Sequence, residues 1–125
     1  MKKVLLTIVF GFLALFINAQ TDLDAKEFQS KYGAETKALL VDVRQDWELK
    51  NGFISGAVNY DFMDDNFMNK FKNTPKDFPI YVYCASGGRS GEAAELLTKA
   101  GYKKVYNLKG GMRAWTAQNL PVRKP

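Results

Sequence analysis

The 125-residue chain has no histidine and only one cysteine, and these two shortages narrow the chemistry available to it. Without histidine there is no general base for a Ser-His-Asp triad, so that class of hydrolase is excluded. A lone cysteine cannot form an internal disulfide, and one thiol without imidazole partners cannot build a zinc site. Any chemistry at Cys84 must therefore be activated by the loop around it and not by an imidazole.

Several other features are scarce. The chain has no internal repeat, low-complexity stretch or linker, and its length fits one domain. Its formal net charge of +5 is mild and its basic residues are scattered, which suits a small anionic substrate and argues against nucleic acid as a partner. The acidic residues Asp61, Asp64 and Asp65 lack the spacing of a calcium loop, so we expect a solvated helix face there.

The N-terminal segment at 1–19 is predicted to be a signal peptide. A short basic start precedes an apolar run at 4–17, and small and polar residues follow it around Ala19. The alternative is an uncleaved membrane anchor, but the run is shorter than the roughly 20 residues that a spanning helix needs. We expect cleavage after Ala19, a mature domain at 20–125, no membrane contact after cleavage, and a periplasmic or secreted protein.

Apolar runs alternate with helical patterns along the rest of the chain. Strands are predicted at 38–43, 56–59, 79–83 and 104–108. Helical segments are predicted at 24–33, 46–50, 61–71, 91–100 and 112–119. This alternation predicts an α/β fold with three layers, in which helices cover both faces of a central, mostly parallel sheet of about five strands. Sites in such sheets lie beyond the carboxyl ends of the strands, where Cys84 is placed.

The loop after the strand at 79–83 carries the candidate site. Its glycines allow several backbone N–H groups to converge on one sulfur atom, and the start of a helix follows. Both features favour a thiolate over a thiol, and they would stabilise the outer sulfur of a persulfide equally well. An inert core cysteine is the alternative, but it would gain nothing from a glycine-rich turn beside it. The candidate residues are Cys84 as the nucleophile and Ala85, Ser86, Gly87, Gly88, Arg89 and Ser90 as the surrounding loop.

Four motifs in this chain resemble those of the rhodanese family of sulfurtransferases. The letters LVDVR and WE within 40–48 are similar to the family's first signature, and GFISGAVN at 52–59 to its second. Residues 83–90 resemble its active-site loop, and residues 108–122 resemble its closing signature. The resemblance covers about 22–122 and departs at Phe53, where the family usually has histidine, and at Ser55, where it often has proline.

The resemblance implies a reaction by double displacement. Cys84 would take a sulfur atom from thiosulfate or a similar small anionic donor and pass it, through a persulfide, to cyanide or a thiol. It implies no metal and no organic cofactor, and nothing in the chain demands more than a monomer. The alternative within the family is a persulfide carrier of low turnover or a rhodanese-like protein-interaction module.

Loop length argues against a third function. Related phosphatases and arsenate reductases carry a Cys-x5-Arg loop that fits a tetrahedral phosphate, whereas the spacing from Cys84 to Arg89 is Cys-x4-Arg. The shorter loop resembles the sulfurtransferase form. Two basic residues near the last predicted strand, Lys109 and Arg113, are secondary candidates for the rim of the pocket.

The remaining polar residues near the motifs have structural interpretations. Arg89 either guides the anionic donor or braces the loop, and we favour guidance. Asp42, at the end of a buried strand, is expected to satisfy backbone groups or to pair with a cation. Arg44 and Glu48 are expected to form a structural ion pair, and Trp115 is expected in the core.

Overall fold

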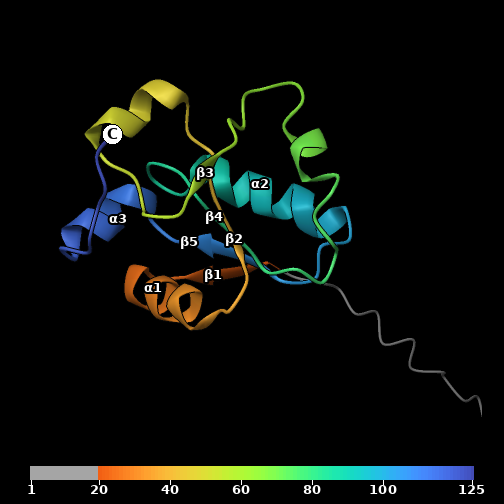
Figure 1. The fold of residues 1–125 in the computed structure, drawn as a ribbon, viewed down its shortest axis with the longest axis horizontal. Coiled ribbons are helices and arrows are strands. Elements are labelled where there is room, and N and C mark those ends of the chain that lie inside the picture. The colour runs from red at the N-terminus through yellow and green to blue at the C-terminus, as the bar shows by residue number, and fades with distance from the viewer. Residues whose placement is uncertain (1–19) are drawn as a thin grey trace, which may run out of the picture.

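The computed structural model describes residues 20–125, so the predicted signal peptide at 1–19 lies outside the described residues. Five strands form one sheet in the order β1-β5-β4-β2-β3, and every neighbouring pair is parallel (Figure 1). This confirms the predicted α/β fold. The strands are β1 (Thr21–Leu23), β2 (Leu39–Asp42), β3 (Val58–Asn59), β4 (Ile80–Tyr83) and β5 (Val105–Leu108).

Helices cover both faces of the sheet. Helices α1 and α3 contact each other on one face, whereas α2 packs against β4 and β5 on the other (Figure 1). Within residues 20–125, no helix is long and apolar enough to cross a membrane. The helices are α1 (Ala25–Ala34), α2 (Gly88–Lys99) and α3 (Gly111–Ala117). The short 3-10 helices η1 (Asp46–Asn51) and η2 (Met68–Phe71) lie between β2 and β4, on either side of β3.

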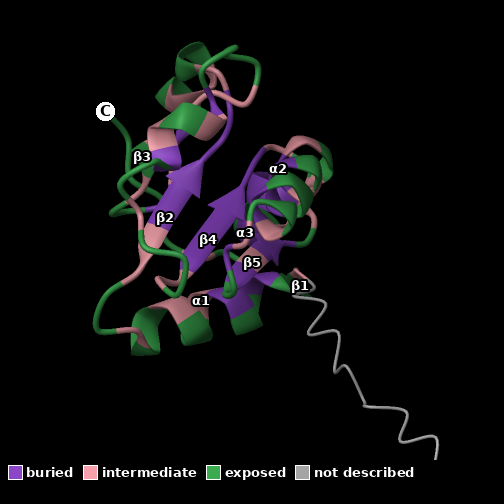
Figure 2. Ribbon diagram, turned by 90° about the vertical axis from the view of Figure 1, so that its right-hand side faces the viewer, coloured by how far each residue is buried: buried purple, intermediate pink, exposed green. Residues whose placement is uncertain are grey.

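Strand β4 lies at the centre of the sheet and is buried on both faces (Figure 2). Tyr81 and Tyr83 belong to the core cluster beneath α1 and α3, whereas Ile80 and Val82 belong to the cluster beneath α2. Continuous apolar runs are typical of parallel strands covered on both sides, because successive side chains point to opposite faces. The β4 run therefore builds two cores at once and fixes the position of the residue that follows it.

The N-terminal part of the domain agrees closely with the predicted elements, with one additional strand. Asp24 Oδ1 accepts a hydrogen bond from Glu27 N at 2.9 Å, which is the predicted cap of α1. The helix ends at Ala34, one residue beyond the predicted end. Strand β1, which pairs with the edge of β5, was not among the predicted strands.

The predicted helix at 61–71 is wrong for most of its length. Only η2 is helical there. The apolar residues that indicated the helix are not all buried, since Met63 is exposed. The Asp61 side chain accepts a hydrogen bond from Met63 N at 2.8 Å, and the Asp64 side chain accepts one from Asn66 N at 2.9 Å. Such local bonds offer the backbone an alternative to helix, which explains the turns.

Candidate active site

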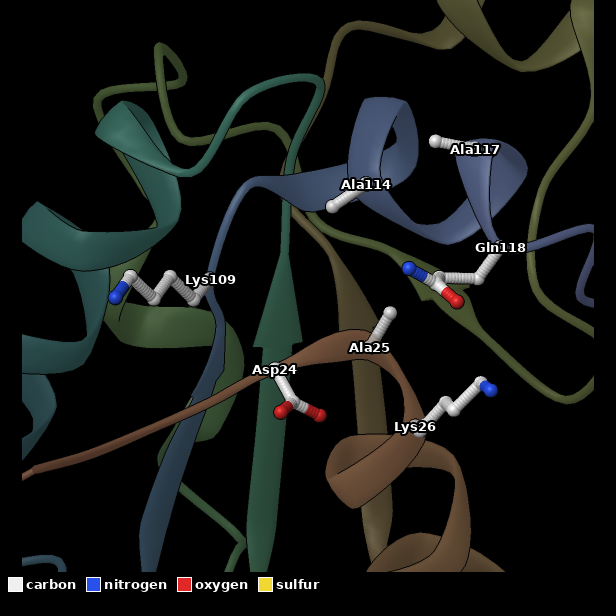
Figure 3. A pocket seen from close by; sticks show the side chains of 7 residues that line it. All are labelled: Asp24, Ala25, Lys26, Lys109, Ala114, Ala117 and Gln118. Carbon is white, nitrogen blue, oxygen red and sulfur yellow. The ribbon is translucent and has the colours of Figure 1, made fainter.

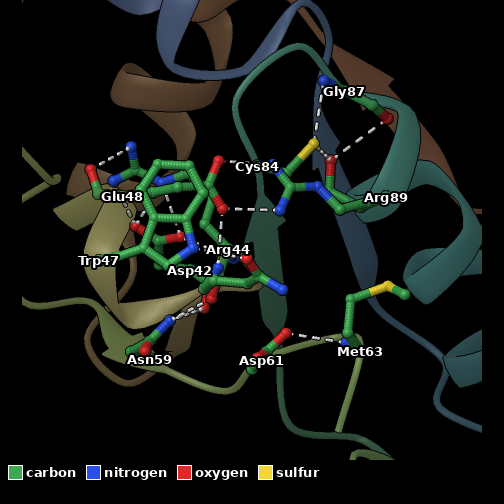
Figure 4. Close-up of polar contacts among 12 residues, drawn as sticks. Asp42, Arg44, Trp47, Glu48, Asn59, Asp61, Met63, Cys84, Gly87 and Arg89 are labelled. Atoms are coloured by element: carbon green, nitrogen blue, oxygen red, sulfur yellow. Dashed lines mark hydrogen bonds and ion pairs between the residues drawn. The ribbon is translucent and has the colours of Figure 1, made fainter.

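Cys84 follows β4 directly, at the carboxyl edge of the sheet, and its side chain is only 1% exposed. Its Sγ accepts a hydrogen bond from Gly87 N at 3.0 Å and one from the Ser90 hydroxyl at 3.3 Å (Figure 4). Both donors are electrically neutral. The predicted convergence of the loop on the sulfur atom is therefore present in the structure.

The loop is shorter than expected because α2 begins at Gly88, three residues before the predicted start at Gly91. Gly87 precedes the helix with φ of +100°, in the left-handed region that favours glycine. Gly88 does not share this conformation, and no atom outside its chain neighbours and its own helix backbone lies within 4 Å of where its Cβ would be. The expectation that both glycines supply unusual backbone angles holds only for Gly87. Arg89 and Ser90 accordingly lie in the first turn of α2, whose amides are not used within the helix.

Two opposing effects act on the Cys84 thiol. Burial raises the pKa of Cys84, but hydrogen bonds from the Ser90 hydroxyl and from the backbone amides of Ser90, Ser86 and Gly87 lower it. The net result is a pKa below the ordinary value for cysteine. Thiolate is the nucleophilic form, so this environment favours a reactive sulfur.

The start of α3 holds the other side of the loop. Met112 N donates to the Cys84 carbonyl at 2.9 Å, and Arg113 N donates to the Ala85 carbonyl at 3.0 Å. Gly111 has φ of +59°, and a Cβ there would lie 2.5 Å from the Cys84 carbonyl oxygen. Sequence reasoning missed this contact, although the Gly-Gly pair before α3 was a visible signal. These contacts fix the two peptide groups that follow the nucleophile.

Asp42 and Arg44 form a buried ion pair beside the site. Arg44 Nη2 lies 2.7 Å from Asp42 Oδ2, and Arg44 Nε also donates to this carboxylate. Burial by itself would lower the pKa of Arg44, but the bond to Asp42 raises it above its ordinary value. The Arg44 guanidinium also donates to the Gly52 carbonyl at 2.8 Å, so it joins the end of β2 to the chain that follows η1. The structural role predicted for Asp42 is confirmed.

Glu48 has a different partner from the one predicted. Its carboxylate accepts two hydrogen bonds from Arg89, at 2.7 and 2.8 Å, whereas Arg44 reaches only the Glu48 backbone carbonyl, at 3.3 Å (Figure 4). The predicted Arg44–Glu48 ion pair is therefore wrong, because Asp42 already occupies the Arg44 guanidinium. Of the two roles left open for Arg89, bracing the loop is the one for which the structure provides a partner.

The remaining predicted residues lie away from Cys84 or contact the loop only through the backbone. Trp115 is buried, as predicted, and donates from Nε1 to the Pro121 carbonyl at 2.8 Å. Lys109 lines a separate pocket of about 600 Å³ beside α1 and α3, together with Asp24 and Gln118 (Figure 3). Arg113 is exposed, and its backbone amide contacts the loop.

Comparison with known proteins agrees with this geometry. The model of the Rhodanese-like domain family matches residues 24–118. The chain belongs to this family. It is 34% identical over 124 residues to the uncharacterized protein YqhL of Bacillus subtilis, an alignment that covers 92% of this chain and 94% of that one. It is 32% identical over 104 residues to a sulfurtransferase of Allochromatium vinosum, covering 83% of this chain and 95% of the relative.

Solved structures give the same result for the fold of this rhodanese-like protein. A rhodanese-related protein from Thermoplasma volcanium superposes with a TM-score of 0.71 at 28% identity, covering 82% of this chain and 97% of that chain. The chain is thus a member of the rhodanese-like sulfurtransferase family, and the family domain spans residues 24–118. Membership implies a sulfur donor and a thiol acceptor as its substrates.

Proposed function

We propose that this protein is an exported sulfurtransferase that carries sulfur on Cys84. It would take the sulfane sulfur of thiosulfate or a similar donor and pass it to cyanide or a thiol. The observation that supports this most directly is the pair of neutral donors, Gly87 N–H and the Ser90 hydroxyl, directed at Sγ. Such donors stabilise a thiolate, and they suit the anionic outer sulfur of a persulfide for the same reason.

The proposed reaction has two displacements. In the first, the Cys84 thiolate attacks the outer sulfur of thiosulfate, the donor's S–S bond breaks, and sulfite leaves with the bonding electrons. This leaves Cys84–S–S⁻ in the loop. In the second, cyanide or a thiolate attacks the outer sulfur, and the Cys84 thiolate leaves. Such covalent catalysis predicts ping-pong kinetics.

Intact-mass measurement of the protein after incubation with a sulfur donor tests the proposal. We expect a gain of one sulfur atom that Cys84→Ser abolishes, followed by thiocyanate formation when cyanide is added. A persulfide that forms readily but is released slowly would favour the alternative of a persulfide carrier or an interaction module. Absence of persulfide with every sulfane donor tried would contradict both the transferase and the persulfide carrier, and would favour the interaction module.

Export and oligomeric state are separate parts of the proposal. Export is supported by the basic start, apolar run and small residues at 1–19. Expression of the whole chain, fractionation of the cells and N-terminal sequencing of the product would test it, with cleavage expected after Ala19. A monomer is expected by sedimentation, because the proposed site is built from one chain.

A further inference from the structure

The charged groups around Cys84 suggest which donor the site prefers. We propose that the site selects a hydropersulfide of the form R–S–SH over the thiosulfate dianion, and that Glu48 sets this preference by occupying Arg89. This inference rests on the proposed persulfide chemistry at Cys84 and specifies its donor. Its basis is the pairing of two arginines, Arg89 within the loop and Arg44 just beyond β2, with carboxylates.

Arg89 is the cation within the loop itself, and a carboxylate binds the edge of its guanidinium that carries Nη1 and Nη2. Nη1 and Nη2 each lie within hydrogen-bond distance of a different Glu48 oxygen, 2.7 and 2.8 Å away. This is the bidentate geometry with which arginine would otherwise hold an oxyanion such as thiosulfate. A thiosulfate ion would have to displace Glu48 before it could bind to Nη1 and Nη2 of Arg89.

Glu48 is held in place by more than the ion pair. Its Oε2 also accepts a hydrogen bond from Gln45 N at 2.9 Å, which forms the cap of η1. Its side chain is 14% exposed and that of Arg89 is 29% exposed, so water screens the pair only partly. Arg89 holds the pKa of Glu48 below its ordinary value, and the carboxylate therefore stays charged at neutral pH.

Arg44 does not provide a substitute cation. Its side chain is 6% exposed, and its guanidinium is bonded to Asp42 and to the carbonyls of Gly52 and Glu48. Each of the two arginines is thus matched by one carboxylate. The Cys84 thiolate then adds a negative charge that only Arg89, already paired with Glu48, lies close enough to offset. This disfavours the thiosulfate dianion more than the protonated R–S–SH form, whose sulfur atoms carry no charge.

The rim of the site suits an organic donor. Trp47 is 60% exposed and Met63 is 63% exposed, and both belong to segments that lie at the carboxyl edge of the sheet (Figure 4). Trp47 is steadied by a hydrogen bond from Nε1 to Gln45 Oε1. Phe62 N, next to Met63, donates to the Val43 carbonyl just beyond β2. Exposed apolar side chains beside a site can contact the carbon atoms that adjoin sulfur in R–S–SH, and thiosulfate carries no carbon.

The transfer from such a donor balances without an added oxidant or reductant. The Cys84 thiolate attacks the terminal sulfur of R–S–SH, a new S–S bond forms on Cys84, and the donor's S–S bond breaks. The departing R–S⁻ takes the proton of the former S–SH group. The products are Cys84–S–S⁻ and R–SH, so one thiolate is exchanged for one persulfide anion.

Single-turnover loading of Cys84, followed by intact mass, measures the preference directly. With the wild-type protein we expect cysteine persulfide to load Cys84 at least tenfold faster than thiosulfate at equal concentration, within the roughly 10- to 1,000-fold range of local electrostatic effects on association. Faster loading by thiosulfate would overturn the donor inference and leave the proposed function intact. Failure of both donors to load Cys84 would instead contradict the proposed function itself.

Glu48→Gln tests the cause. The amide keeps the shape and can still accept from Gln45 N, but it leaves Arg89 with an unmatched charge. We expect thiosulfate loading to rise by about tenfold, with cysteine persulfide loading changed less than about threefold. Adding Arg89→Met should remove the gain. An unchanged ratio of the two rates in Glu48→Gln would overturn the role of Glu48.

Asp46→Asn is the matched control, because it removes the same charge from an exposed position on the same turn, η1. It should leave the ratio of rates as in the wild-type protein. Equal gains in Asp46→Asn and Glu48→Gln would show that total charge, not release of Arg89, governs the rate, which would also overturn the proposal. Trp47→Ser should slow cysteine persulfide loading and leave thiosulfate loading unchanged.

Discussion

Two anionic groups lie at the carboxyl ends of neighbouring strands, and the molecule stabilises them in opposite ways. Asp42 ends β2 opposite Tyr83 of β4, and Cys84 follows one residue later. The Asp42 carboxylate is matched by the full charge of Arg44 at 2.7 Å. The Cys84 sulfur is instead contacted by the neutral donors Gly87 N–H and Ser90 O–H.

The difference separates a structural anion from a reactive one. A buried carboxylate needs a strong, permanent partner, because an isolated charge in the interior is costly. A nucleophile must keep its electron pairs available, and neutral hydrogen bonds lower the pKa of Cys84 without committing the sulfur to a counter-ion. Arg89 belongs to the same loop as Cys84, but both of its Nη groups bind Glu48, which preserves this division.

Breaking the structural pair should have the largest effect. Arg44→Met leaves the Asp42 carboxylate buried without its cation and leaves the Gly52 carbonyl without its donor. We expect a loss of about 3–5 kcal/mol in the free energy of unfolding, measured by urea denaturation. The double variant Asp42→Asn/Arg44→Met should recover part of that loss. A loss below about 1 kcal/mol in the single variant would contradict the structural role of the pair.

Removing a neutral donor from Cys84 should have an intermediate effect. Ser90→Ala deletes the hydroxyl that lies 3.3 Å from Sγ. Hydrogen bonds to charged groups contribute about 1.5–3 kcal/mol, so the pKa of Cys84 should rise by about one to two units. The thiolate fraction at neutral pH then falls, and alkylation by iodoacetamide becomes slower there. The midpoint of the alkylation rate against pH measures the shift.

Thr98→Ala is the control for Ser90→Ala. It removes a hydroxyl from the same helix, where Thr98 donates to the Ala94 carbonyl far from the sulfur. Its alkylation midpoint should match that of the wild-type protein. A midpoint that does not move in Ser90→Ala would mean that the backbone amides alone set the reactivity of Cys84.

The features that could be predicted from the sequence are local ones. The apolar run of β4 and the Asp24 cap each depend on a few consecutive residues, and both are present as predicted. The loop from Cys84 to Ser90 was identifiable for the same reason, because the nucleophile and its donors, Gly87 N–H and the Ser90 hydroxyl, lie within one short segment of the sequence. Strand β1 was missed because three residues carry little periodic signal, and its pairing depends on β5.

The ion pairs could not be predicted because distant parts of the chain compete for them. Arg44 has three carboxylates within four residues, Asp42, Asp46 and Glu48, and sequence spacing does not choose between them. The choice is made by Arg89, which is 41 residues from Glu48 and reaches it only after β4 and α2 are in place. Similarly, the aspartates of the segment at 61–71 redirect its backbone into turns, so that its apolar stripe does not become a helix.

Breaking the ion pair between Arg89 and Glu48, here called the outer pair, should cost the least stability, although Arg89 belongs to the reactive loop. Arg89→Met removes an ion pair that water screens only partly, although more than it screens the buried Asp42–Arg44 pair. Solvent-exposed pairs contribute about 1 kcal/mol or less, so we expect a loss of about 1 kcal/mol in the free energy of unfolding, well below the loss in Arg44→Met. A double-mutant cycle with Glu48→Gln, followed by urea denaturation, isolates the coupling between the two side chains. A coupling as large as the loss in Arg44→Met would mean that the outer pair stabilises the fold as strongly as the buried pair does. The contrast between a structural pair at Asp42 and a reactive site at Cys84 would then not hold for Arg89, which belongs to the reactive loop.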